Sequence, residues 1–105
     1  MIERHWDATA KNEMANQYSQ HLLSETFPGL MKIEGFQRAQ ILRQDIRDGV
    51  HFRIITVWKN ENSIRAFAGD DLELAVVPEK VAQMMIRFDQ RARHFHVVES
   101  LGIRY

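Results

Sequence analysis

The run HFRIITVW, residues 51–58, decides the fold class of this chain, because nearly all of its residues favour extended backbone. An Asp48-Gly49 pair comes just before this run, and a second β-rich segment comes before the pair. Asp-Gly between two such segments is a strong signal for a tight hairpin. We therefore expect two antiparallel strands, at residues 36–46 and 50–58, joined by a short turn.

The sequence before this hairpin predicts a strand and then a helix. Residues 2–8 alternate in the manner of a strand, and apolar residues recur at helical spacing from about residue 9 to residue 25. Thr9 or Asn12 is expected to cap this helix, and Phe27-Pro28-Gly29 is expected to stop it.

The sequence after the hairpin predicts a broken helical region and a last strand. A cap at Asn60 or Asn62 begins a helix that ends at Gly69, and residues 72–77 suggest another helical turn. After Pro78, apolar residues at positions 81, 84, 85 and 88 have helical spacing. Residues 92–99 are expected to form the last strand.

This order, β-α-β-β-α-β, is that of a ferredoxin-like α+β domain over residues 1–105, with a four-stranded antiparallel sheet and helices on one face. The strand at residues 51–58 is apolar on both faces, so its second face also needs cover. A two-fold homodimer, in which the sheets of two copies meet, supplies that cover. The tail, residues 100–105, is expected either to fray or to contact the partner.

Composition excludes several classes of function. The chain has 14 basic and 14 acidic residues spread along 105 positions, which argues against nucleic acid and anionic membranes as partners. It has no cysteine, which excludes disulfides and thiolate chemistry. No apolar run is long enough to span a bilayer, and the first residues lack a signal core, so we expect a cytoplasmic protein.

Several short segments are similar to those of a known family. They are Glu25-Thr26-Phe27-Pro28-Gly29-Leu30, Gly35-Phe36, Ile55-Thr56-Val57-Trp58, Ala66-Phe67-Ala68-Gly69, Val76-Val77-Pro78 and the stretch from Arg87 to Phe95. On these segments the chain resembles the antibiotic-biosynthesis monooxygenase (ABM) family of dimeric α+β barrels, over nearly its whole length. The resemblance implies the fold and the homodimer; it does not settle the reaction, because similar folds support different chemistry.

Two branches of that family imply different sites. The haem-degrading branch carries an Asn on the first strand, a Trp at the position of Phe67 here, and an iron-binding His near Val77. Residues 70–81 contain no His, so the resemblance argues against haem degradation. The cofactor-free branch oxidises phenols to quinones; its strand Trp corresponds to Trp58, whereas its Asn and Tyr correspond to Ile54 and Ile64.

Histidines are the most unusual candidates for chemistry. His5 lies on the expected first strand, and His94 and His96 lie on the last, which neighbours the first in a ferredoxin-like sheet. We predict that His5 clusters with His94 or His96 across these strands, and that His5 or His94 takes a proton from a phenol or enol, since imidazole titrates near neutral pH. Structural histidines and a metal site are the alternatives; our prediction includes no metal and no cofactor.

Aromatic residues are the candidates for binding the substrate. We predict that Trp6, Trp58, Phe67 and His96 contact a small hydrophobic or aromatic molecule, with packing in the core as the alternative for the tryptophans and Phe67. Arginines on strands, Arg4 among them, need an anion partner. That partner is either an anionic ligand or a carboxylate across the dimer, and the sequence favours the second.

The function predicted from the sequence is therefore a cofactor-independent monooxygenase that acts on a small aromatic or enolic substrate. The alternative is a non-enzymatic dimer that binds a small hydrophobic ligand or takes part in a stress response. The first needs a polar group facing an aromatic-walled cavity, and the second needs only the apolar cavity.

Overall fold

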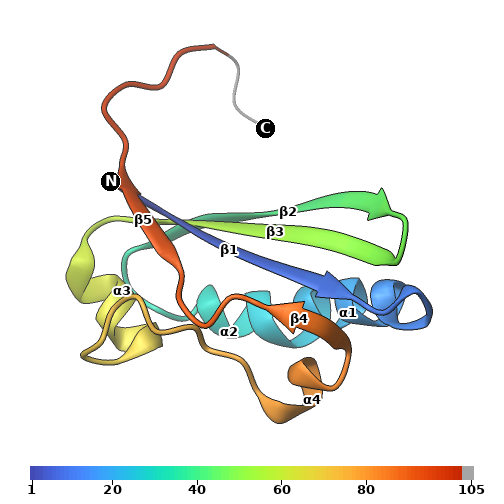
Figure 1. The fold of residues 1–105 in the computed structure, drawn as a ribbon. Helices are drawn as coiled ribbons and strands as arrows, with labels where there is room; N and C mark the ends of the chain where they lie inside the picture. The colour runs from blue at the N-terminus through green and yellow to red at the C-terminus, as the bar shows by residue number, and fades with distance from the viewer. Residues whose placement is uncertain (103–105) are drawn as a thin grey trace.

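An antiparallel sheet carries the helices on one face (Figure 1). The computed structural model describes residues 1–102. The strands are β1 (Ile2–Ala10), β2 (Phe36–Ile46), β3 (Gly49–Trp58), β4 (Met85–Phe88) and β5 (Arg93–His96). The helical elements are η1 (Asn12–Met14), α1 (Ala15–His21), the π-helical η2 (Leu22–Thr26), α2 (Phe27–Leu30), α3 (Glu61–Ala68) and α4 (Glu79–Ala82). No helix within residues 1–102 is long and apolar enough to cross a membrane.

β1 lies inside the sheet, between β3 and an edge formed by two short strands. β4 pairs with the end of β1, and β5 pairs with its beginning, with Arg4 opposite His94. The strand order confirms the ferredoxin-like arrangement. The expected four strands are five over residues 1–102, because an irregular stretch at residues 89–92 divides the edge strand in two.

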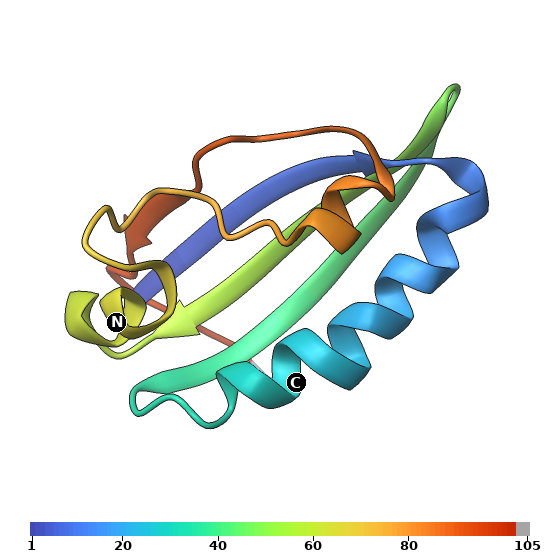
Figure 2. The same cartoon turned by 90° about the horizontal axis from the view of Figure 1, so that it is seen from below.

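The first helical region differs from its prediction at both ends. Thr9 is buried in β1 and does not cap a helix, and no side chain caps η1. Phe27-Pro28-Gly29 does not stop the helix, because α2 follows η2 directly and the four elements form one long rod (Figure 2). The N–H of Phe27 reaches back to Leu22 in a wide π turn, and Pro28 then lies in a first helical turn, where its missing N–H costs little.

The second helical region confirms its predicted cap and corrects the rest. Asn60 and Ser63 form a capping box at the start of α3, and Gly69 ends the helix. Residues 72–77 form no helix, and the helix predicted from positions 81–88 stops at Ala82. Met85–Phe88 instead forms strand β4 and pairs with β1. The helix prediction was wrong here because the spacing of a short apolar run does not distinguish a helix from a strand.

The core lies between the sheet and the helices, and the other face of the sheet is open. Tyr18 packs edge-on against Phe52 at 5.0 Å between ring centroids, and Trp58 packs against Ile64 in a second cluster. On the open face, Val57 is already buried within the single chain, where it lies between Glu3 of β1 and Arg38 of β2. Leu42 and Phe95 remain exposed on that face.

We expect Gly35→Ala to destabilise the protein by about 2 kcal/mol or more. Gly35 has φ +92°, and a Cβ there would lie 2.6 Å from the Ser63 side chain of the capping box. Gly29→Ala is the matched control, because nothing lies within 4 Å of its Cβ position in α2. The control should be neutral or stabilise by up to about 1 kcal/mol. Urea unfolding compares the two, and equal stabilities would contradict the strain at Gly35.

Candidate active site

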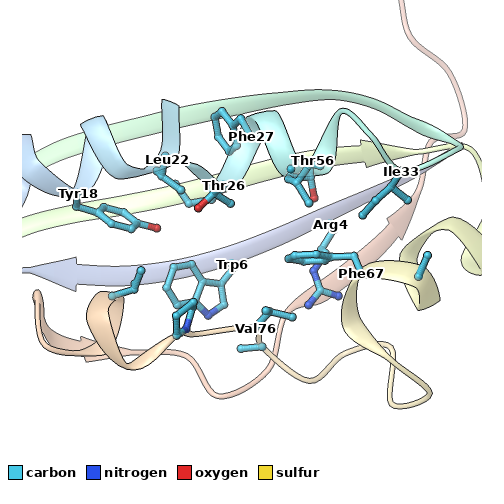
Figure 3. Close-up of a pocket in the computed structure, with 17 residues that line it drawn as sticks. Arg4, Trp6, Tyr18, Leu22, Thr26, Phe27, Ile33, Thr56, Phe67 and Val76 are labelled. Atoms are coloured by element: carbon cyan, nitrogen blue, oxygen red, sulfur yellow. The ribbon is translucent and has the colours of Figure 1, made fainter. Parts of the chain in front are cut away.

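A cavity of about 330 Å³ lies between the sheet and the helices (Figure 3). Trp6, Phe27 and Phe67 give it aromatic walls. Its polar groups come from Arg4, Tyr18, Thr26 and Thr56. The volume is at the lower end of the range of about 300–1,000 Å³ that is typical of small-molecule sites. A mostly apolar pocket with a few polar groups is the usual form of such a site.

Strand alternation and helical spacing place these side chains. On β1, Arg4 and Trp6 share the helix-covered face with buried Ile2 and Ala8. On the long helical rod, Tyr18, Leu22 and Thr26 recur at every fourth residue and line the cavity together. The segment of residues 75–81 closes the side opposite the rod.

Arg4 is the charged residue of the cavity wall, and it is only 5% exposed. Its Nη1 donates hydrogen bonds to the Leu72 carbonyl and to His94 Nε2, the latter at 2.7 Å, and its Nη2 donates to the Leu74 carbonyl at 3.0 Å. The centroid of the Phe67 ring lies 5.7 Å from the guanidinium carbon Cζ. The guanidinium is therefore held in one position by groups from three separate segments.

No carboxylate within residues 1–102 forms an ion pair with Arg4. Burial lowers the pKa of Arg4 to about 10, and the more distant Glu73 offsets part of that effect. Arg4 is still protonated at neutral pH. A buried cation that no carboxylate pairs with is costly, which makes Arg4 a candidate for binding a ligand.

His94 acts as the acceptor for Arg4. An arginine N–H can only donate, so His94 Nε2 carries no proton in this contact and the ring is neutral. Burial and the positive charge of Arg4 both lower the pKa of His94, and Glu73 and Glu61 oppose this weakly. The neutral ring thus fixes the guanidinium without adding a second positive charge.

The hydroxyl groups of Tyr18, Thr26 and Thr56 complete the polar part of the cavity. Thr56 Oγ1 accepts a hydrogen bond from Trp58 Nε1 at 2.8 Å, which leaves its own proton free to donate. Burial raises the pKa of Tyr18, so its hydroxyl stays protonated and is a neutral donor. In Figure 3, Tyr18 and Arg4 lie toward opposite ends of the cavity, with Trp6 between them.

The structure brings only some of the predicted site residues to the cavity. Trp6 and Phe67 line it, and Trp58 lies behind Phe67, stacked at 5.8 Å between ring centroids. Trp58 is fully buried and does not line the cavity. His94 touches the site only through Arg4.

His5 and His96 do not reach this cavity. His5 lies on the open face of the sheet, where it contacts Glu3 at 2.7 Å and the Phe95 ring. His96 is exposed. His5 pairs with Arg93 rather than with His94, and adjacent residues of a strand face opposite sides, so the expected cluster of His5 with His94 or His96 does not form.

The contacts of Arg4 differ from the sequence-based expectation. It faces the helices of its own chain, where carbonyl groups and His94 contact it in place of a carboxylate from a second copy. The sequence signal for this orientation of Arg4 was the alternation along Ile2, Arg4, Trp6 and Ala8, because it places a charged residue among residues of the core face. The hydroxyl of Tyr18 gave no such signal, since a tyrosine at helical spacing usually belongs to the core.

The pH dependence of stability tests the neutral state of His94. The unfolded His94 gains a proton as the pH falls through about 6.5, whereas the folded residue gains it only at lower pH. Acidification should therefore destabilise the fold through His94. We expect a larger drop in melting temperature between about pH 7.5 and pH 5.5 for the wild type than for His94→Gln. An equal drop in both proteins would contradict a lowered pKa.

Comparisons with known proteins identify the family. A model of the antibiotic biosynthesis monooxygenases matches residues 1–72. No protein of curated function matches the sequence. Among solved structures, a Bacillus cereus protein assigned as an antibiotic biosynthesis monooxygenase has a TM-score of 0.67 at 18% identity, over 99% of this chain and 97% of that one.

Two further structures share the fold. A variant of SnoaB, a cofactor-independent oxygenase from Streptomyces nogalater, has a TM-score of 0.67 at 15% identity and covers 95% of both chains. MhuD, a haem degrader from Mycobacterium tuberculosis with two haems bound in its active site, has a TM-score of 0.61 at 16% identity, over 97% of this chain and all of that one. The chain belongs to the antibiotic biosynthesis monooxygenase family.

Proposed function

We propose that this protein is a monooxygenase that oxidises a small aromatic or enolic molecule with dioxygen and without a resident cofactor. The observation that carries the proposal is a protonated, buried Arg4 in the wall of an otherwise aromatic and apolar cavity. Such a cavity takes in a flat apolar molecule, and a cation inside it favours the ionised form of a phenol or enol. Family membership supports the same reaction class.

The reaction needs only the substrate anion and dioxygen. A phenolate passes one electron to dioxygen, and the resulting radical and superoxide combine to form a C–O bond. Loss of the C–H proton and cleavage of the O–O bond then release water and leave a quinone. One oxygen atom enters the product, the other leaves as water, and dioxygen accepts the four electrons that the phenol loses.

The geometry of the cavity and the sequence-based prediction differ on which group accepts the substrate proton. His5 and His94 remain predicted proton acceptors, but neither lines the cavity. The positive charge of Arg4 lowers the pKa of a bound phenol without any proton transfer to a side chain. In this proposal His94 holds Arg4 in position, and the substrate proton leaves to water.

Haem does not fit the same cavity. No histidine lines it, and Tyr18 is the lining residue whose side chain comes closest in chemistry to an iron ligand. Burial raises the pKa of Tyr18, which disfavours the phenolate that iron would need. Within residues 1–102, no group of three His, Asp or Glu side chains is arranged to hold a metal ion. The proposed reaction therefore involves neither haem nor a metal ion.

Oxygen incorporation tests the proposed reaction. Chelator-treated protein is mixed with 2-acetyl-1-naphthol or 1-naphthol under ¹⁸O₂, and mass spectrometry follows the product. We expect a quinone with one ¹⁸O atom, formed in proportion to the protein. Binding of these phenols without oxygen uptake would contradict the monooxygenase and support the non-enzymatic, ligand-binding alternative.

A matched pair of variants links turnover to the cavity. Thr26→Phe fills the cavity from the helical rod, and we expect at least a tenfold loss of rate. Leu23→Phe, in the same π-helical turn, adds a similar ring at a position that is 56% exposed, and its rate should match the wild type. Equal rates in the two variants would place the reaction elsewhere.

We further propose that the open face of the sheet forms a homodimer. Leu42 and Phe95 are 44% and 42% exposed there, and a second copy would bury them. The chain after β5 rises on the side away from the helices, with Val98 and Leu101 almost fully exposed (Figure 1). Residues 103–105 of the tail that was expected to fray or to contact a partner lie outside the described residues.

Sedimentation velocity tests the dimer. We expect a dimer at micromolar concentration, and a shift toward monomer in a Leu42→Glu, Phe95→Glu double variant, because two charges would enter an apolar interface. Leu23→Glu, on the helical side, is the control for an added surface charge. A wild-type monomer at micromolar concentration would reject the dimer.

A further inference from the structure

Arg4 has more hydrogen-bond donors than the protein uses. A guanidinium has five N–H groups. Nη1 donates both of its hydrogens, to Leu72 and His94, and Nη2 donates one, to Leu74. Within residues 1–102, the Nε hydrogen and one Nη2 hydrogen have no protein acceptor.

Arg4 lines the cavity, and its unused Nε is accessible. No side-chain nitrogen or oxygen within residues 1–102 is both fully buried and without a hydrogen-bond partner. Nε of Arg4 has no partner, so it must be accessible, and the cavity is the open space that Arg4 lines. A residue that is only 5% exposed as a whole thus keeps an accessible Nε without a protein acceptor, in the wall of the pocket.

The two unused donors suit a pair of oxygen atoms. In a planar guanidinium, Nε–H and the neighbouring Nη2–H point in parallel, which matches two acceptors side by side. Arg53 on the open face shows the same geometry, since its Nε and Nη2 bind the two oxygens of Asp7 at 2.8 and 3.1 Å. In Arg4, Nε and one hydrogen of Nη2 have no acceptor within residues 1–102, and no carboxylate pairs with them.

We propose that Nε and Nη2 of Arg4 bind an anionic pair of oxygens on the substrate, so that the substrate class is an aromatic acid or a phenol with a neighbouring carbonyl group. Both carry two oxygens side by side on a flat ring. The Leu72 and Leu74 carbonyls and His94 are positioning groups, because they hold the guanidinium with this pair toward the cavity. The proposal rests on the proposed function only in taking this cavity as the substrate site.

The anion would also remove an unfavourable feature of the protein. Burial of Arg4 without a counter-ion disfavours its charged form, and a bound anion restores the missing partner. The rest of the cavity supplies apolar contact through Trp6 and Phe67, and the Trp6 N–H is already bonded to the Asp89 carbonyl. Charge recognition and ring recognition therefore come from different residues and can be separated by mutation.

Equilibrium binding under nitrogen tests the proposal with three probes that share one ring system. They are 2-naphthoate, 2-acetyl-1-naphthol and the neutral methyl 2-naphthoate. We expect the wild type to bind at least one of the first two at least tenfold more tightly than the ester. The probe that shows this preference tells whether a carboxylate or a phenol-carbonyl pair is the natural oxygen pair.

Variants assign that preference to Arg4. Arg4→Met should abolish the preference and leave the affinity for the ester within about twofold, and Arg4→Lys should keep part of it, because an ammonium keeps the charge without the parallel donors. Arg47→Met removes an equal charge from the exposed β2–β3 turn and should bind as the wild type does. Circular dichroism and melting temperature establish that each variant is folded. If Arg4→Met does not fold, Arg4→Lys takes its place in the comparison.

His94 is tested by rescue. His94→Leu removes the acceptor and should lower the affinity for the preferred anionic probe without changing that for the ester. His94→Gln keeps an acceptor and should restore most of the affinity, which a merely structural role would not predict. A preference for anions that survives in both Arg4 variants, or equal binding of all three probes by the wild type, would overturn the proposal.

The two proposals fail in different ways. Arg4-dependent anion binding without ¹⁸O incorporation would remove the oxygenase and leave the anion site. Oxygen incorporation without Arg4-dependent binding would leave the oxygenase and remove the anion site.

Discussion

The pairing of β1 on both of its edges is the constraint on which the rest of the structure depends. Its register with β3 is continuous from Ile2 to Ala10, and its other edge is shared by β4 and β5. Because its position is fixed on both sides, the alternation of its side chains is fixed too. Arg4 and Trp6 therefore enter the cavity, while His5 and Asp7 face the open side.

The same alternation separates two kinds of polar chemistry. On the open face, Asp7 and Arg53 form an ion pair that is partly exposed, so solvent weakens it. On the helical face, Arg4 is surrounded by carbonyls and a neutral histidine, and no carboxylate within residues 1–102 forms an ion pair with it. The cavity is thus the place where an added anion would gain most, because the surrounding medium is apolar.

The helical rod shapes the cavity through an irregularity. The π turn at η2 keeps Thr26 on the same side as Tyr18 and Leu22 and lets the chain pass Pro28 without a break. π turns often occur at functional sites, and here the turn lies in the wall of the cavity. A continuous rod also covers more of the sheet than the shorter helix that Phe27-Pro28-Gly29 predicted.

Local chemistry was enough to predict the hairpin at Asp48-Gly49, the cap at Asn60 and the ferredoxin-like order, because each depends on residues close together in the chain. It also identified Trp6 and Phe67 as pocket candidates. The divided edge strand, the π turn and the separation of His5 from His94 were decided by tertiary structure, since they depend on which backbone groups find partners across the sheet. The Arg4–His94 contact joins residues 90 positions apart, and no spacing in the sequence encodes it. Sequence alone could say that Arg4 needs an anion, but only the folded chain shows that carbonyl groups and His94 surround it and that no carboxylate within residues 1–102 pairs with it.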